Sequence, residues 1–229
     1  MKYYSLANIL KKNARYNMVF GERSNGKTYS VLDYAVKNYF KTGQQIAVLR
    51  RWREDFKGKR GAAYFDNLVY NGEQQNKIKE YSNGKYDHTV YLSGRWYMAY
   101  YDEELEKNIT APEPFAFSFA LTEMEHEKGN SYPLVTTILF DEFMSRGMYL
   151  PDEFVLFMNT LSTIIRHRDN VKIFMCANTV DMIGCPYFKE MGLKHVKDMK
   201  KGDIDVYEYG NSGLKVAVEY SVSPNKEGK

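Results

Sequence analysis

Residues 21–28 read GERSNGKT, and this octapeptide matches the pattern G-x-x-x-x-G-K-[ST] at every fixed position. The apolar run YNMVF at 16–20 precedes it, and apolar side chains recur at helical spacing from Thr28 to Phe40. The pattern predicts a buried strand, a glycine-containing turn and a helix in succession. In this arrangement, a phosphate-binding loop joins a strand to a helix.

Each residue type in the octapeptide has a chemical reason to be there. Glycine lets the backbone wrap closely around a phosphate and direct successive N–H groups at it. Lys27 can reach the β- and γ-phosphates, the Thr28 hydroxyl can ligate Mg²⁺, and the helix N-terminus adds partial positive charge. We therefore predict that ATP and Mg²⁺ bind to Gly21, Glu22, Arg23, Ser24, Asn25, Gly26, Lys27 and Thr28.

Two carboxylates follow a second buried strand. The run LVTTILF at 134–140 is apolar and β-branched, and it ends at Asp141 and Glu142. These residues could simply end a strand in a turn. Together with the phosphate-binding loop, the pattern favours Asp141 as the magnesium residue and Glu142 as the general base for an attacking water. A carboxylate directly after the magnesium aspartate favours a hydrolase over a kinase.

Two further polar residues each have two interpretations. Asn178 follows the predicted strand at 171–176, where it is either a γ-phosphate sensor or an ordinary residue at a strand end. Arg166 ends the helix predicted at 152–165. Its charge either complements the helix dipole or serves as an arginine finger for a neighbouring subunit, and the pattern alone favours the dipole.

The remaining pattern predicts an α/β domain with an antiparallel insertion. The insertion contains a hairpin that turns at Asn83-Gly84 between strands near 77–81 and 86–92, and residues 95–101 extend it. A terminal hairpin is predicted at 205–222. We predict an ATPase domain at 1–204, followed at 205–229 by this hairpin and a linker-like tail.

The composition restricts the class of protein. The net charge is only +3, so contacts with nucleic acid would be local, and the basic clusters at 50–53 and 57–60 are more often solvated surface than phosphate sites. Cys176 and Cys185 form neither a metal-ligand spacing nor a disulfide framework, which favours a reducing cytoplasm. No apolar stretch approaches ~18 residues, so neither a transmembrane helix nor a membrane partner is expected.

Four segments carry a resemblance to a known family. They are GERSNGKT, VLRRWRED, EKGNSYPLVTTILFDEF and IIRHRDNVKIFMCAN, in that order. From about Met18 to about Pro186, the chain resembles the DNA-encapsidation (packaging) ATPases of small tailed phages. The resemblance implies a P-loop NTPase fold of the additional-strand catalytic-Glu (RecA-like) type, with a central, mostly parallel sheet flanked by helices. It also implies a homo-oligomeric ring, typically a pentamer, that drives double-stranded DNA into a procapsid in the host cytoplasm.

The resemblance also implies roles for individual residues. Four residues keep the roles given above, namely Lys27, Thr28, Asp141 and Glu142. Arg166 matches the trans-acting arginine of the family, which reverses the interpretation from pattern alone. Lys128 matches a second basic residue near the neighbour's nucleotide. In the loop after the second motif, Arg146 is a candidate for DNA contact.

The resemblance further implies a portal or procapsid vertex as a partner, together with a packaging RNA in some members. Family members usually continue into a nuclease-like domain, whereas this sequence stops at Lys229 after a linker-like end, which favours a truncation. Two other functions stay open from the sequence. One is a different P-loop DNA translocase or helicase-like motor, and the other is a nucleotide switch that does not hydrolyse ATP.

Overall fold

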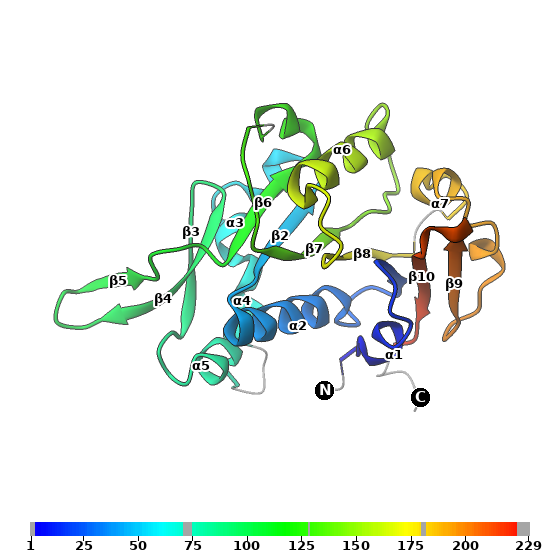
Figure 1. Ribbon diagram of the computed structural model, residues 1–229. Coiled ribbons are helices and arrows are strands. Elements are labelled where there is room, and N and C mark those ends of the chain that lie inside the picture. Colours follow the sequence, from blue (N-terminus) through cyan, green and yellow to red (C-terminus); the bar gives the residue numbers. More distant parts are fainter. Residues whose placement is uncertain (1–2, 71–74, 128, 180–181, 224–229) are drawn as a thin grey trace.

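The computed structural model describes residues 3–70, 75–127, 129–179 and 182–223 (Figure 1). Within these ranges, ten strands form one mixed sheet in the order β3-β4-β6-β2-β7-β8-β1-β10-β9, with β5 paired to β4. The strands are β1 Tyr16–Gly21, β2 Gln45–Arg50, β3 His88–Leu92, β4 Arg95–Asp102, β5 Lys107–Thr110, β6 Ala116–Ala120, β7 Val135–Asp141, β8 Lys172–Asn178, β9 Ile204–Tyr209 and β10 Leu214–Ser221.

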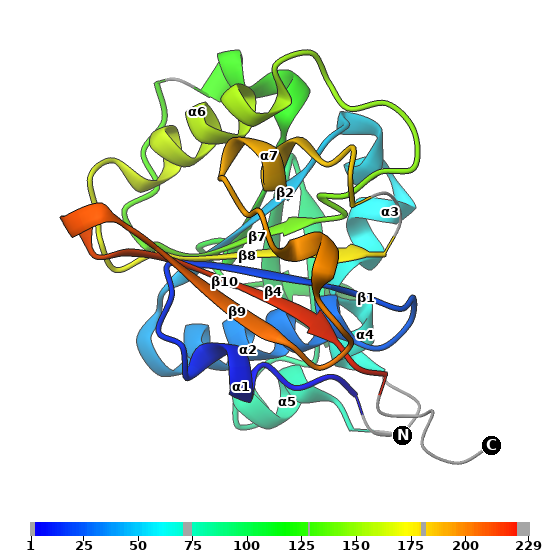
Figure 2. The same ribbon diagram turned by 90° about the vertical axis from the view of Figure 1, so that its right-hand side faces the viewer.

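Helices cover both faces of this sheet (Figure 2). The α-helices are α1 Ala7–Leu10, α2 Lys27–Thr42, α3 Lys59–Ala62, α4 Asp66–Val69, α5 Lys77–Tyr81, α6 Glu153–Ile165 and α7 Pro186–Glu190. The 3-10 helices are η1 Arg53–Phe56, η2 Ala63–Phe65, η3 Leu121–Glu127, η4 Val196–Asp198 and η5 Gly210–Ser212. Among the residues that the structure describes, no helix combines the length and apolarity needed to cross a membrane.

The central strands β6, β2, β7, β8, β1 and β10 run parallel to one another. Both faces of β1 are buried. Met18 and Phe20 pack in the core beneath α6 and α7, while Val19 packs in the core against α2. Burial on both sides explains why the strand is apolar throughout and does not alternate. The predicted central parallel sheet is confirmed.

One predicted hairpin is wrong. Residues Lys77–Tyr81 form the helix α5, whose first turn is capped by the Asn76 side chain, which accepts a hydrogen bond from Lys79 N at 2.9 Å. Asn83 and Gly84 have positive φ angles and end this helix, with Gly84 N donating to Lys79 O at 2.8 Å. Left-handed residues terminate a helix as readily as they make a hairpin turn, so the same sequence signal fits both structures.

The actual hairpin of the insertion joins β3 to β4 through Ser93 and Gly94, both with positive φ. Next to this turn, Trp96 is fully buried and its Nε1 donates to Gly61 O at 2.7 Å. The ring of Tyr64 lies 5.6 Å from the ring of Trp96. This packing fixes Tyr64, which reaches the candidate site.

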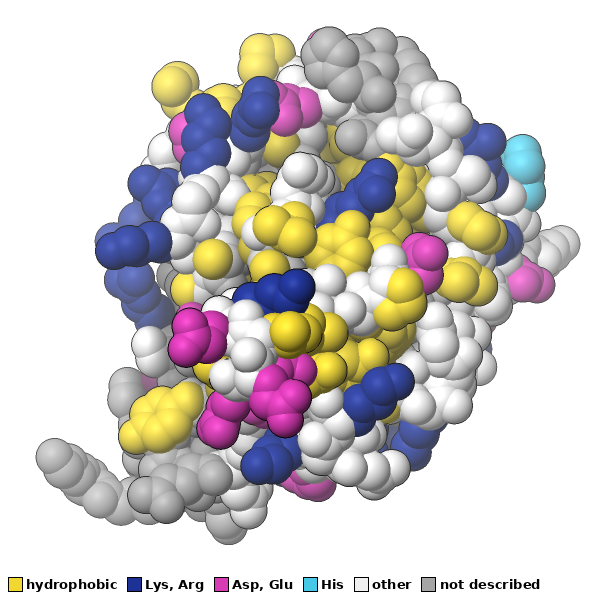
Figure 3. Space-filling view, turned by 90° about the vertical axis from the view of Figure 1, so that its left-hand side faces the viewer, with side chains coloured by type: hydrophobic (Ala, Val, Ile, Leu, Met, Phe, Trp, Pro, Cys, Tyr) yellow, Lys and Arg dark blue, Asp and Glu magenta, His cyan; other side chains and the backbone are white. Residues whose placement is uncertain are grey.

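The outer surface of the insertion is mixed in character. Figure 3 views the molecule from the side on which the insertion protrudes, and hydrophobic side chains gather there beside a group of acidic ones. Exposed apolar side chains of the insertion include Leu92, Tyr101 and Leu105.

The predicted terminal hairpin is present and belongs to the same sheet. β10 pairs antiparallel with β9 and parallel with β1, so it lies between them. Gly21 at the end of β1 lies opposite Ser221 of β10 and Asn178 of β8. The end of the hairpin therefore lies beside the start of the predicted phosphate-binding loop.

Candidate functional site

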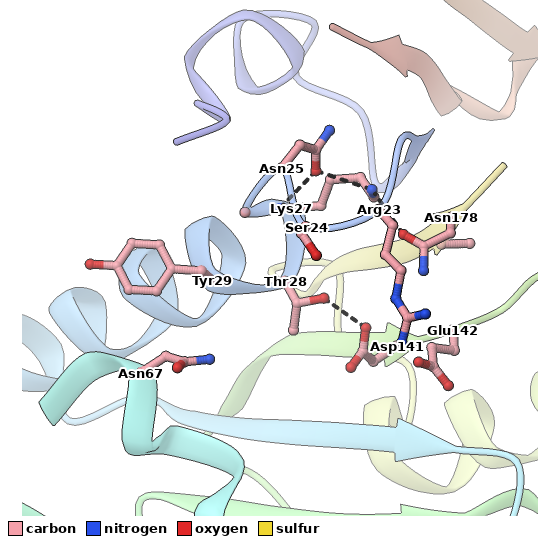
Figure 4. Close-up of a pocket in the computed structure, with 12 residues that line it drawn as sticks. Arg23, Ser24, Asn25, Lys27, Thr28, Tyr29, Asn67, Asp141, Glu142 and Asn178 are labelled. Atoms are coloured by element: carbon pink, nitrogen blue, oxygen red, sulfur yellow. Dashed lines mark hydrogen bonds between the residues drawn. The ribbon is translucent and has the colours of Figure 1, made fainter. Parts of the chain in front are cut away.

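The carboxyl ends of the parallel strands meet in a cavity of about 260 Å³ (Figure 4). This is the edge at which α/β sheets bind their ligands. Residues from four parts of the chain line the cavity, namely Arg23, Ser24, Asn25, Gly26, Lys27, Thr28, Tyr29, Asn67, Asp141, Glu142, Ala177 and Asn178. The structure thus brings the two predicted motifs and Asn178 together.

The predicted phosphate-binding loop has the backbone that anion binding requires. Ser24 and Gly26 both adopt left-handed conformations, with φ angles of 60° and 88°. Alternation of right- and left-handed residues turns successive N–H groups toward a common concavity. Gly26 is also the residue at which α2 begins, so the positive end of this helix is directed at the cavity.

Lys27 is held in this concavity with its ammonium group surrounded by oxygen atoms. Its side chain is buried, and Nζ donates to Glu22 O at 2.6 Å, to Asn25 Oδ1 at 3.1 Å and to Asn178 Oδ1 at 3.4 Å. Burial lowers the pKa of Lys27, while the Asp141 carboxylate acts to raise it. These oxygens take the place that phosphate oxygens would take, and Asn178 lies where a sensor would contact the same anion.

The two predicted magnesium residues face each other across the cavity. The Thr28 hydroxyl donates to Asp141 Oδ1 at 2.8 Å. Hydroxyl and carboxylate oxygens are the hard ligands that Mg²⁺ prefers, and Mg²⁺ is usually held by one or two protein oxygens together with substrate phosphates. The residues present therefore fit a magnesium ion bound together with a nucleotide.

Glu142 has an exposed carboxylate and a constrained backbone. Its side chain is 61% exposed, and its φ angle is 62°. Its N–H donates to Cys176 O of the adjacent strand at 2.7 Å. Figure 4 shows its side chain and that of Arg23 both directed into the space next to Asp141. A solvent-accessible carboxylate in this place can accept a proton from a water molecule that attacks a bound phosphate.

Arg50 is a residue of the candidate site that the sequence analysis missed. Its Nη2 lies 3.1 Å from Asp141 Oδ2 and its Nη1 lies 2.7 Å from Glu142 Oε2. Although burial acts to lower it, the Asp141 carboxylate raises the pKa of Arg50. The interpretation of the cluster at 50–53 as solvated surface is wrong for this residue, because its side chain is only 19% exposed.

A sequence signal for Arg50 existed. Like Asp141, it directly follows a short apolar run of the sequence, IAVL at 46–49, which is typical of a buried strand, and carboxyl ends of neighbouring parallel strands share one edge of the sheet. Tyr64 had no such signal. Its hydroxyl donates to Asp141 Oδ2 at 3.0 Å, and it comes from a segment whose sequence predicts a loop with a short helix. Burial raises the pKa of Tyr64 well above its usual range, so the hydroxyl remains a donor.

The side chain of Asn25 shapes the loop itself. Its Nδ2 donates to Ser221 Oγ at 2.9 Å, and Ser221 Oγ donates to Phe20 O at 3.1 Å. The backbone oxygen of Asn25 accepts a hydrogen bond from Tyr4 N at 2.9 Å. The loop is therefore held between the N-terminal segment and β10, a support through Asn25 that the sequence analysis did not predict.

Arg166 lies at the opposite edge of the sheet from the cavity. It follows α6 and precedes β8, whereas Asn178 ends β8 at the cavity, and a strand of this length spans about 20 Å. The Arg166 side chain is exposed, and its Nη2 donates to Asn130 O at 2.6 Å. Arg166 therefore does not join the site of its own chain.

Two other basic residues, Arg146 and Lys128, were predicted as site residues. Arg146 is exposed in the loop between β7 and α6. Lys128 lies outside the residues that the structure describes.

Comparisons with known proteins identify relatives of this chain in sequence and in fold. The family model of the podovirus DNA encapsidation protein (Gp16) matches residues 1–226. The DNA packaging protein of Bacillus phage B103 is 29% identical over 188 residues, which cover 81% of this chain and 50% of that protein. The DNA packaging protein of Bacillus phage phi29 is 27% identical over 202 residues, covering 87% of this chain and 52% of that protein. The chain thus spans about half the length of these relatives.

Solved structures show the same fold. The N-terminal domain of the DNA packaging ATPase from bacteriophage phi29 superposes with a TM-score of 0.73 at 22% identity, over 98% of each chain. The large terminase ATPase domain of Thermus phage P74-26 gives a TM-score of 0.52 at 15% identity, over 96% of this chain and 80% of that chain. With a family model that matches nearly its whole length, the chain belongs to the podovirus DNA encapsidation protein family.

Proposed function

We propose that this chain is the ATP-hydrolysing part of a motor that translocates double-stranded DNA into a viral procapsid. The observation that carries the proposal is the position of Thr28 opposite Asp141, with Lys27 and Glu142 beside them in one cavity. Membership of the encapsidation family and the fold of packaging ATPase domains support the motor role.

The residues around the cavity have separate roles in the proposed hydrolysis of ATP. The N–H groups of the loop at 21–28 bind and orient the phosphates, and Lys27 places a positive charge against them. Thr28 and Asp141 hold Mg²⁺. When bound, Mg²⁺ neutralises charge that develops on the phosphate oxygens. Glu142 orients the attacking water and takes its proton, and Asn178 contacts the terminal phosphate.

A second subunit completes this site in the proposal. Arg166 is exposed at the edge of the sheet opposite to its own cavity, so its charge can stabilise a transferring phosphoryl group only in a neighbouring chain. Lys128 is assigned a similar role there. A homo-oligomeric ring, of which a pentamer is the expected form, provides such neighbours.

The partners follow from the same motor role. Double-stranded DNA is the substrate that is moved, and Arg146 contacts its phosphates from an exposed loop. The ring acts at the portal vertex of a procapsid, together with a packaging RNA, in the host cytoplasm.

One comparison tests hydrolysis. Calorimetry measures uptake of Mg·ATP by the wild-type chain and the Glu142→Gln variant, and phosphate release measures turnover. We expect similar binding by both proteins and a loss of turnover of at least ~10²-fold in the variant, because the general base is removed. Glu113→Gln changes an exposed loop carboxylate away from the cavity and serves as the control.

The other outcomes discriminate among functions. The wild type could bind Mg·ATP without turnover even when it has assembled into rings in which each subunit has an intact Arg166. This result would favour a nucleotide switch. Full turnover by Glu142→Gln would remove this residue from the catalytic role. The absence of Mg·ATP uptake by the wild type would refute the proposal as a whole.

A further inference from the structure

A buried ion pair packs against the turn that follows β7 and contains Glu142 and Phe143, which we call the catalytic turn. Arg51 and Glu153 form a two-pronged contact, in which Nε donates to Oε2 and Nη2 donates to Oε1, both at 2.7 Å. The side chains of Arg51 and Glu153 are only 7% and 1% exposed. The pair joins the end of β2 to the first residue of α6, which are 102 positions apart.

The same pair also holds main-chain atoms of the catalytic turn. Arg51 Nη1 donates to Glu142 O at 3.2 Å, and Arg51 Nη2 donates to Phe143 O at 3.0 Å. Glu153 Oε2 accepts from Leu150 N at 2.8 Å. Both ends of the segment between β7 and α6 are therefore fixed to one guanidinium–carboxylate pair.

α7 contributes a further contact. The hydroxyl of Tyr187 donates to Glu153 Oε1 at 2.6 Å, so both carboxylate oxygens have two partners each. Burial raises the pKa of Tyr187, and its hydroxyl stays a donor. The Arg51 guanidinium also lies 5.2 Å from the ring centre of Tyr149. Both oxygens of Glu153 and four N–H groups of Arg51 are thus hydrogen-bonded, so the pair cannot shift without disturbing α7 and the segment at 142–152.

The consecutive residues Arg50 and Arg51 both contact Glu142. Successive side chains of a strand point to opposite faces, and β2 ends at Arg50 with Arg51 next in the chain. Arg50 binds the carboxylate of Glu142, and Arg51 binds its carbonyl oxygen from the other face. Glu142 has a φ angle of 62°, a conformation that is strained for a non-glycine residue and persists only where surrounding contacts impose it.

Stability by itself is a weak reason for such a pair. Removing two charges from water costs about as much as their attraction returns, and apolar replacements of similar volume are often neutral. The contacts of Arg51 with Glu142 and Phe143 would be lost in an apolar replacement, although packing would remain.

We propose that Arg51 is a positioning residue, which acts through the main chain of Glu142 and is itself oriented by Glu153. This inference rests on the proposed hydrolysis of ATP. The guanidinium keeps the Glu142 backbone in its left-handed conformation and thereby keeps the carboxylate directed at the site of water attack. Arg51 lies on the opposite side of the turn from the cavity and does not line it.

The first test is Arg51→Lys. Lysine keeps the charge and can pair with Glu153. However, one ammonium group cannot replace the planar guanidinium, which donates to a carboxylate and to two carbonyl groups at once. We expect kcat to fall at least ~10-fold while the affinity for Mg·ATP stays within about twofold, since the phosphate-binding loop is not touched. Arg95→Lys makes the same change at an exposed position of β4 and is the matched control.

The second test separates positioning from stability. In the double variant Arg51→Met with Glu153→Met, neither charge is left unpaired, so thermal stability should lie closer to the wild type than in Arg51→Met alone. We expect kcat to stay as low as in Arg51→Met. Recovery of wild-type kcat in the folded double variant would show that the pair serves only stability and would overturn the proposal.

Hydrogen exchange gives a readout that does not depend on hydrolysis. Without nucleotide, Arg51→Lys should accelerate amide exchange at 143–152, while exchange in β8 stays as in the wild type. Unchanged exchange at 143–152 would overturn the proposal even if the wild type hydrolyses ATP. If the wild type shows no turnover, the proposed function fails, and this measurement still decides whether Arg51 fixes the turn.

Discussion

The Thr28 hydroxyl donates a hydrogen bond of 2.8 Å to the Asp141 carboxylate, although 113 positions separate the two residues. This contact joins the start of α2 to the end of β7 at the point where both would share a metal ion. An ordinary core contact would not require a hydroxyl and a carboxylate there, whereas Mg²⁺ does.

Loss of the Thr28 hydroxyl or of the Asp141 charge should reduce the effect of Mg²⁺ on nucleotide binding. Thr28→Val replaces the hydroxyl with a methyl group of similar size, and Asp141→Asn removes the charge. We expect each change to weaken ATP binding on the order of tenfold or more in the presence of Mg²⁺ and little in EDTA. The measurement is ATP affinity under both conditions, with Thr42→Val at the exposed end of α2 as the control. An equal loss in EDTA would indicate a defect in the loop itself.

Arg50 competes electrostatically with a metal ion at Asp141. Its Nη2 lies 3.1 Å from Oδ2, and a second cation close by is repelled by the guanidinium. Arg50→Met should therefore lower the Mg²⁺ concentration needed for half-maximal ATP binding about threefold or more. It should also lower kcat, because Glu142 loses its side-chain partner.

A titration of ATP binding with Mg²⁺ measures the first effect, and phosphate release at saturating Mg²⁺ measures the second. Arg53→Met removes a cation from an exposed ion pair three positions along the chain and is the control for metal binding. A requirement for more Mg²⁺ in Arg50→Met would contradict the electrostatic explanation.

Arg166 should act only between chains. Arg166→Ala and Glu142→Gln each impair a different half of a shared site, so each protein alone should hydrolyse ATP poorly. In a mixture, some interfaces combine an intact Glu142 with an intact Arg166, and turnover should rise above that of either variant. An arginine supplied by a neighbour can increase the rate by ~10³ or more. Absence of recovery in mixtures that demonstrably form rings would exclude the role in trans.

Glu219 makes stability depend on pH. Burial raises the pKa of this carboxyl, while the hydrogen bond from the Tyr4 hydroxyl at 2.5 Å lowers it. Because the folded-state pKa lies above the usual value near 4.5, the folded chain binds more protons than the unfolded chain at intermediate pH. Stability from this group is thus fully present below that value and falls as pH rises through the raised pKa.

Glu219→Gln keeps an acceptor for Tyr4 and removes the ionisation. We expect the variant to gain stability relative to the wild type as pH increases from about 4.5, by about 1.4 kcal/mol for each unit by which folding raises the pKa. Urea unfolding at several pH values measures the gain. Glu208→Gln changes a more exposed carboxyl on β9 and is the matched control variant.

The local elements were predicted well where sequence spacing determines them. The strand at 16–20, the following helix and the apolar strand before Asp141 are all present. A strand that is buried on both faces requires a continuous apolar run, and a helix with one buried face requires apolar residues at every third or fourth position, so both patterns are visible in the sequence. The strand predicted at 77–81 is wrong, since a short helix and a strand can share one five-residue pattern. In α6, helical spacing alone places Met158 on the same face as Phe157 and Leu161, yet Met158 is 38% exposed, while Ile164 is buried.

The sequence by itself determined the chemistry of the candidate site. An octapeptide with fixed glycines, a lysine and a threonine encodes an anion-binding turn through its local backbone preferences. The pair Asp141-Glu142 at the end of an apolar run likewise follows from adjacent residues. These features depend on residues close together in the chain, so the sequence displays them.

Only the tertiary structure decided what surrounds these residues. Arg50 on the carboxylate of Glu142, Arg51 on its carbonyl oxygen and Tyr64 on Asp141 are contacts over 77 to 92 positions. Such contacts depend on which strands are neighbours in the sheet and on how far each side chain is buried. Local propensities do not carry that information, because the order of strands is selected by the packing of the whole core.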